Sequence, residues 1–171
     1  QDGGSVSSTA PITADLLNGI KSINRGLWSV GGDTSATISL GNWYYSGFPF
    51  CFSNAGAVNF SGWIASEVSG VGNTNPAHLR FEGDTTVTVG GGIYVGRGGE
   101  NGIGKMEIRD GASVSGRWLI GYFKRDRGGV YLSGGQMTMS GLDKSSTFNA
   151  LGHSDPNGGA SASAGYIIQR G

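Results

Sequence analysis

The second half of the chain alternates apolar and polar residues in short segments that are separated by glycine. Residues 86–90 read Thr-Val-Thr-Val-Gly, and residues 105–108 read Lys-Met-Glu-Ile. Such alternation is typical of a β-strand with one buried face, because successive side chains of a strand point to opposite sides. The pattern therefore predicts an all-β fold.

The order of these segments recurs along the chain, which indicates an internal repeat. Val87 corresponds to Val114 and then to Met137, at intervals of 27 and 23 residues. A period in the twenties that holds three short strands predicts a β-solenoid, in which stacked coils bury a common core. Two further sets correspond in the same way: Gly96, Gly121 and Gly152, and Met106, Val130 and Ile167.

We therefore predict a right-handed parallel β-helix that occupies residues 26–171 as a single domain, with the clearest repeats in residues 85–171. Alternate apolar residues are expected to form ladders inside the coils, while the Thr, Ser, Lys and Glu residues between them face outward. The predicted core ladder consists of Val87, Val89, Val95, Met106, Ile108, Val114, Ile120, Val130, Leu132, Met137, Met139 and Leu151.

Residues 1–25 are predicted to form an N-terminal arm and a short capping helix. Residues 1–10 are small and polar, as in an extended arm. In residues 12–23 the apolar positions recur at helical spacing, which predicts a short amphipathic helix. Such a helix would cover the open end of the β-stack, where strand edges are otherwise unpaired.

Residues 43–52 are rich in aromatic side chains, and two roles stay open for them. Buried, Trp43, Tyr44, Tyr45 and Phe48 would belong to the core and to a subunit interface. Exposed, they would offer a surface on which a sugar ring stacks. Cys51 lies in the same apolar stretch and is the only cysteine, so we predict a buried, unreactive thiol.

Composition and charge narrow the range of partners. Glycine contributes 34 of 171 residues, about three times its usual share, while only 4 prolines exclude a collagen-like chain. Twelve basic and twelve acidic residues give a formal net charge of zero. A neutral surface does not attract nucleic acid, and it does not oppose self-association by repulsion. The expected partner is therefore another copy of the chain, and not nucleic acid.

The chain is expected to be exported. It begins with Gln1 and not with Met, which suggests that a signal peptide has been removed. No apolar run approaches the ~20 residues that a membrane-spanning helix needs. We therefore expect an extracellular or cell-surface protein that is not inserted in a membrane.

Residues 79–171, roughly half of the chain, resemble the β-strand repeats of bacterial autotransporter passenger regions and related large exported proteins. The resemblance rests on Ile-Tyr-Val-Gly-Arg-Gly-Gly at residues 93–99, Ile-Arg-Asp-Gly-Ala-Ser-Val at residues 108–114 and Leu-Ser-Gly-Gly-Gln-Met-Thr at residues 132–138. It implies a right-handed parallel β-helix on a bacterial surface or in an extracellular fibre.

The sequence predicts no catalytic, cofactor-binding or metal-binding residue. His78 and His153 are not spaced as in a zinc-binding motif. His153 and Asp155 could assist a serine nucleophile, but the sequence has no Gly-x-Ser-x-Gly motif that would present one. Enzymes that cleave polysaccharides need clustered carboxylates, whereas the acidic residues here are spread along the chain. The compact charged segment at residues 124–127 is expected to be a solvated corner. We therefore expect a protein that is not an enzyme.

These observations predict a structural protein, the subunit of a self-assembling extracellular fibre, sheath or surface layer, formed by end-to-end or side-by-side contacts between β-solenoids. The ends of a solenoid expose strand edges that need a cap or accept another subunit. Two alternatives stay open: an adhesin module that binds a surface polysaccharide, and a polysaccharide lyase or hydrolase. Ice binding would need flat threonine ladders, which Thr86 and Thr88 match only in part.

Overall fold

Short β-strands make up the structure, a computed structural model, and the described residues include no helix. The predicted capping helix over residues 12–23 falls outside the described residues, except for residues 22–23, which form a strand. The structure describes residues 5–8, 22–23, 27–32, 34–35, 37–47, 49–66, 77–96, 102–121, 126–140, 150–152 and 164–170.

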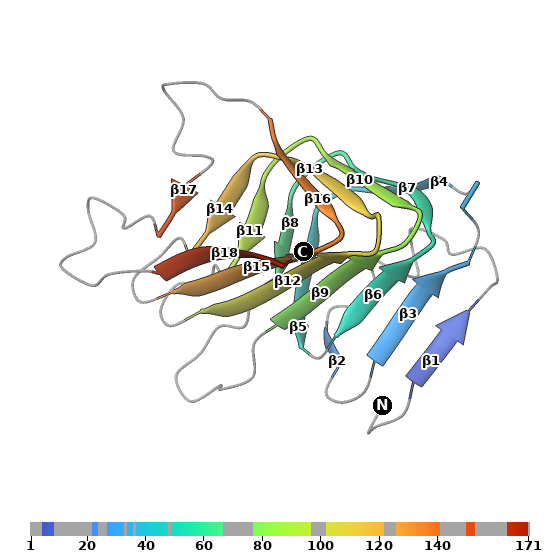
Figure 1. The fold of residues 1–171 in the computed structure, drawn as a ribbon, viewed down its shortest axis with the longest axis horizontal. Coiled ribbons are helices and arrows are strands. Elements are labelled where there is room, and N and C mark those ends of the chain that lie inside the picture. Colours follow the sequence, from blue (N-terminus) through green and yellow to red (C-terminus); the bar gives the residue numbers. More distant parts are fainter. Residues whose placement is uncertain are drawn as a thin grey trace.

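The strands form three sheets, and from residue 27 onward successive strands enter the three sheets in turn (Figure 1). The seven-stranded sheet has the order β1 (Ser5–Ser8), β3 (Leu27–Gly31), β6 (Phe50–Ser53), β9 (Ala77–Glu82), β12 (Ile103–Arg109), β15 (Arg127–Ser133) and β18 (Ala164–Arg170). The five-stranded sheet has the order β4 (Thr37–Leu40), β7 (Gly56–Phe60), β10 (Thr85–Val89), β13 (Ser113–Gly116) and β16 (Gln136–Met139). The six-stranded sheet has the order β2 (Ser22–Ile23), β5 (Trp43–Gly47), β8 (Ile64–Ser66), β11 (Ile93–Val95), β14 (Trp118–Ile120) and β17 (Ala150–Leu151).

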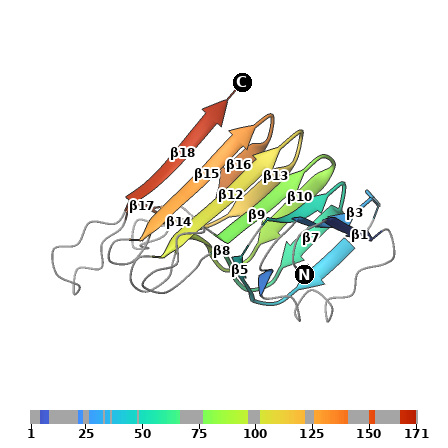
Figure 2. The same cartoon turned by 90° about the horizontal axis from the view of Figure 1, so that it is seen from below.

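All neighbouring strands in these sheets are parallel, and each strand pairs with its counterpart in the next coil. Figure 2 shows β9, β12, β15 and β18 side by side along the stack. The predicted parallel β-helix is therefore confirmed. Its coils also include residues 27–66, and β1 and β2 add strands to two of the sheets ahead of residue 26.

The predicted alignment of the repeats matches the register of the strands. Val87 pairs with Val114, and Val114 pairs with Met137. The side chains at one register position point to the same side of the sheet, so these residues form one ladder through three coils. A second predicted set forms another ladder, consisting of Met106, Val130 and Ile167.

Glycines occupy the corner that follows the strands of the six-stranded sheet. Gly96, Gly121 and Gly152 have φ angles of 70°, 68° and 64°. A Cβ on Gly96 would collide with the carbonyl oxygen of Arg127, and one on Gly121 with that of Ala164. Glycine is therefore required here both by the left-handed backbone and by the close approach of the next coil.

Most residues of the predicted core ladder are buried. Leu132 and Met137 are half-buried and pack against the core, and the side chain of Leu151 lies outside the described residues. Met139 departs from the prediction, because its side chain is 38% exposed. It belongs to β16, the last strand of the five-stranded sheet, so no described strand covers it. The buried members are Val87, Val89, Val95, Met106, Ile108, Val114, Ile120 and Val130.

An aromatic cluster fills the core of the early coils. The ring centroid of Trp43 lies 5.5 Å from that of Tyr45, 5.2 Å from that of Phe50 and 6.2 Å from that of Phe60. Trp43 is 2% exposed and Tyr45 is fully buried, so neither can present its ring to a sugar or a partner. The surface role considered for these two residues is therefore wrong.

The other members of the aromatic stretch differ in position. Tyr44 is half-buried, and Phe48 lies outside the described residues. Cys51 is buried, as predicted. Burial raises the pKa of its thiol to about 12, and the charge of Glu82 adds to this effect. The thiol therefore stays protonated and unreactive near neutral pH.

Candidate functional site

Charged side chains gather on the outer face of the seven-stranded sheet. Burial alternates along β12, and the outward positions include three charged side chains, Lys105, Glu107 and Arg109. The register of β12 with β9 sets each of them beside another ionisable side chain. The three pairs are His78 with Lys105, Arg80 with Glu107, and Glu82 with Arg109.

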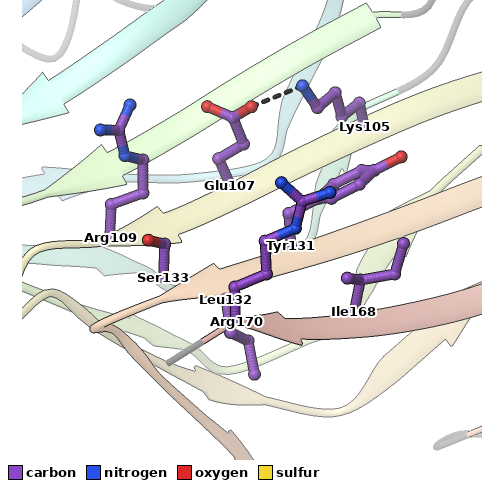
Figure 3. A pocket seen from close by; sticks show the side chains of 8 residues that line it. All are labelled: Lys105, Glu107, Arg109, Tyr131, Leu132, Ser133, Ile168 and Arg170. Atoms are coloured by element: carbon purple, nitrogen blue, oxygen red, sulfur yellow. Dashed lines mark ion pairs between the residues drawn. The ribbon is translucent and has the colours of Figure 1, made fainter.

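Glu107 lies at the centre of this group. Its Oε2 is 2.7 Å from Nε of Arg80 and 3.3 Å from Nε2 of His78. Its Oε1 is 2.5 Å from Nζ of Lys105, the ion pair that Figure 3 shows. The close approach of His78 is the main reason why the pKa of Glu107 lies far below its usual range, and Lys105 and Arg80 add to it. Partial burial acts in the opposite direction and is outweighed.

The low pKa limits what Glu107 can do chemically. A general acid that cleaves glycosidic bonds needs a raised pKa, so that it still carries a proton near neutral pH. Glu107 is ionised there and is a weak base, because its charge is already stabilised by its partners. Its contacts with His78, Arg80 and Lys105 suit a structural role, in which the carboxylate holds these side chains in place.

A groove of about 360 Å³ lies beside this group and crosses three coils (Figure 3). Its cations outnumber its carboxylates by three to one, and the single carboxylate is that of Glu107. The lining residues are Lys105, Glu107 and Arg109 of β12, Tyr131, Leu132 and Ser133 of β15, and Ile168 and Arg170 of β18.

Two of the cations in the groove are weakly held. Nε of Arg109 lies 3.7 Å from Oδ2 of Asp110, and both side chains are well exposed, so this ion pair is weak. Arg170 is exposed and forms no ion pair with the residues that the structure describes. Lys105, in contrast, is engaged by Glu107.

Tyr131 forms part of the groove wall and is held on two sides. Nζ of Lys105 lies 4.8 Å from the centroid of its ring. Its hydroxyl group is 2.9 Å from that of Tyr166, and the two rings meet edge to face. This hydrogen bond raises the pKa of Tyr166, and partial burial adds to the effect.

Some of these charged residues are close in sequence, and others are brought together only by the fold. Lys105, Glu107 and Arg109 are close in sequence, whereas Arg80 and Arg170 reach them only through strand pairing. The signal that links them is the repeat itself. Once Met106 is aligned with its counterparts in the neighbouring coils, the outward-facing residues that follow it also align from one coil to the next, and these include the charged ones.

The charged segment at residues 124–127 is not simply a solvated corner. Asp126 is fully buried, and its Oδ1 accepts a hydrogen bond of 2.7 Å from the backbone N–H of Gly102. The prediction is wrong for this residue, because its carboxylate satisfies a backbone donor of the preceding loop. Arg127 is exposed, and residues 124 and 125 lie outside the described residues.

The described residues contain no group of three His, Cys, Asp or Glu side chains suited to a metal ion. His153 and Asp155 lie outside them. The same part of the chain contains no helix that is long and apolar enough to cross a membrane.

Comparisons with known proteins add no family to this picture. No protein-family model, no curated protein and no solved structure matches the chain.

Proposed function

We propose that the chain is an exported structural protein that self-associates end to end. The observation that carries the proposal is the exposure of core-type side chains in the last coil that the structure describes. The extracellular setting is supported by the resemblance of residues 79–171 to the repeats of exported bacterial proteins.

Exposure rises along the ladders toward the C-terminal end. Val114 is 1% exposed, whereas its partner Met137 in the next coil is only half-buried. Val130 is fully buried, but its partner Ile167 is half-buried. Together with Met139, these side chains form an apolar end, and apolar surface of this kind favours contact with a partner.

The opposite end of the five-stranded sheet is closed. Ile38 and Leu40 lie on β4, which pairs with a neighbour on one side only, as β16 does. They are nevertheless only 7% and 4% exposed. Among the described residues, the outermost strand near the C-terminus therefore exposes core-type side chains, whereas the outermost strand at the other side of the sheet does not.

The seven-stranded sheet has unpaired backbone edges through which two copies could pair. In the described part of the chain, β18 and β1 are the two outermost strands of this sheet, each with one unpaired edge (Figure 2). If β18 of one copy pairs with β1 of the next in parallel, the sheet continues across the contact and the edge hydrogen bonds are satisfied. Such a head-to-tail contact does not close on itself and produces a filament.

A charge placed at the apolar end tests the proposal. Met139→Lys should abolish filaments, because docking would bury an unpaired ammonium group. Gln136→Lys is the matched control, since Gln136 lies on the same strand, is exposed and belongs to the row of Thr86 and Ser113 on the outer face.

Negative-stain electron microscopy at rising protein concentration supplies the measurement. We expect filaments from the wild-type chain and from Gln136→Lys, and single particles from Met139→Lys. Single particles or closed dimers of the wild-type chain at every concentration would refute head-to-tail assembly, as would filaments of Met139→Lys.

A further inference from the structure

We propose that the groove over β12, β15 and β18 binds an acidic saccharide, with a carboxylate of the ligand held between Arg109 and Arg170. The site uses outward-facing side chains of these strands, including β18, whereas the proposed assembly uses the backbone edge of β18, so the two contacts engage different groups of that strand.

The register of the sheet places the two arginines on either side of a hydroxyl group. Ser133 pairs with Arg170. Ile108 and Leu132, which precede Arg109 and Ser133, pair with each other, and Arg109 forms a bridge to Gly134, the residue after Ser133. Neighbouring strands are about 4.8 Å apart, so the two arginine backbones are separated by about 10 Å. Two long side chains can span this distance from both sides and meet one anion above Ser133.

The three side chains Arg109, Ser133 and Arg170, here called the charged row, suit the binding of a carboxylate. A guanidinium group donates two parallel hydrogen bonds to the two oxygens of a carboxylate, and such pairs are stronger than neutral hydrogen bonds. The hydroxyl of Ser133 can donate a third. Within the described residues, the weak pair with Asp110 is the only ion pair that involves either arginine.

The neighbouring row supplies an apolar surface beside the charged one. Tyr131 pairs with Ile168, and Ile168 is 37% exposed. The rigid ring of Tyr131 and the side chain of Ile168 form a surface that fits the C–H groups of a sugar ring. Binding sites commonly combine such apolar contact with a few placed polar groups.

Glu107 does not oppose an anionic ligand. Its charge is balanced by Arg80 and Lys105. Glu82 pairs with Arg109 in the strand register, but within the described residues it forms no ion pair with either arginine. The charges of Arg109 and Arg170 can therefore act on the ligand. These two charges are too few for nucleic acid, where affinity depends on many phosphate contacts. They match one acidic sugar in a chain, with its neighbours lying over the apolar row.

Titration calorimetry with the tetramer of galacturonic acid tests the site. Arg109→Gln and Arg170→Gln should each weaken binding about tenfold, as expected for the loss of one charge-assisted hydrogen-bonding group. Arg170→Lys keeps the charge but loses the paired donors, so it should also bind more weakly than the wild-type chain.

Arg127→Gln is the matched control, because Arg127 is exposed on the same sheet but begins β15, at the end of the strand away from the groove. It should bind like the wild-type chain, and a neutral tetramer of galactose should not bind. The proposal is wrong if the neutral sugar binds equally well, if Arg127→Gln weakens binding as much as Arg170→Gln, or if short duplex DNA displaces the saccharide. Unchanged melting curves will show that the variants are folded.

Discussion

Glu107 illustrates how a single residue orders the outer face of the β-helix. Its side chain is 14% exposed and contacts cationic groups from two neighbouring strands. Because its pKa is lowered in the folded state, the folded protein holds the ionised form more strongly than the unfolded chain does. The carboxylate therefore contributes to stability above the unfolded pKa of about 4.3, and this contribution declines as the pH falls below that value.

Replacing Glu107 by Gln should lower the free energy of unfolding at pH 7 by about 2 kcal/mol. Removing one member of a fully buried pair costs about 3–5 kcal/mol, and partial exposure to solvent reduces this value. Urea unfolding at pH 7 and pH 3 provides the measurement, and the variant should lose less stability between these pH values than the wild-type chain. Asp110→Asn is the control, because Asp110 is exposed and Asn tolerates its φ of 53°. An equal loss in both variants would mean that the ion pairs of Glu107 contribute nothing.

Trp43 gives a second test at the residue scale. It packs against four aromatic rings inside the coils, so Trp43→Ala should lower the free energy of unfolding by about 3–5 kcal/mol. Tyr44→Ala, the adjacent half-buried position, should cost clearly less. Thermal unfolding followed by circular dichroism distinguishes the two. A Trp43→Ala variant that melts like the wild-type chain would show that this ring is not in the core.

At the scale of the element, the corner glycines fix where each strand of the six-stranded sheet ends. Gly96 combines a left-handed backbone with the close approach of the next coil, so a side chain there meets two obstacles. Gly41, in contrast, has no heavy atom within 4 Å of an added Cβ. Comparing Gly96 with Gly41 therefore distinguishes a glycine that the corner requires from a glycine that another residue could replace.

Gly96→Ala should therefore lower the free energy of unfolding by about 2 kcal/mol or more, since the left-handed conformation alone costs about 1–2 kcal/mol. Gly41→Ala should leave stability nearly unchanged. Urea unfolding of both variants measures the difference. If the two substitutions had the same effect, the corner assigned to Gly96 would be incorrect.

The same elements show how far the sequence predicts the fold. The Val87, Val114 and Met137 ladder could be predicted because strand alternation and glycine position recur together. The coils of residues 27–66 are harder to predict from the sequence, because their core is aromatic and lacks the Val-Gly-Arg pattern of the later repeats. The groove could not be predicted from spacing alone, since Arg80 and Arg170 come from loosely spaced repeats. Burial of Asp126 depends on a loop donor that no strand pattern reveals.

At the scale of the whole molecule, the β-helix has two different ends and a neutral overall charge. Core-type side chains are more exposed at one end of the described stack than at the other, which gives the stack a direction, and neutrality removes a general barrier to association. End-to-end assembly would set every strand perpendicular to the filament axis, because the coils stack along that axis. Side-by-side assembly would not require this orientation.

X-ray fibre diffraction from aligned filaments tests this arrangement most directly. End-to-end stacking predicts a reflection near 4.8 Å along the filament axis, from the spacing of parallel strands in successive coils. The same reflection perpendicular to the axis, or its absence from ordered filaments, would contradict end-to-end assembly of the β-helix.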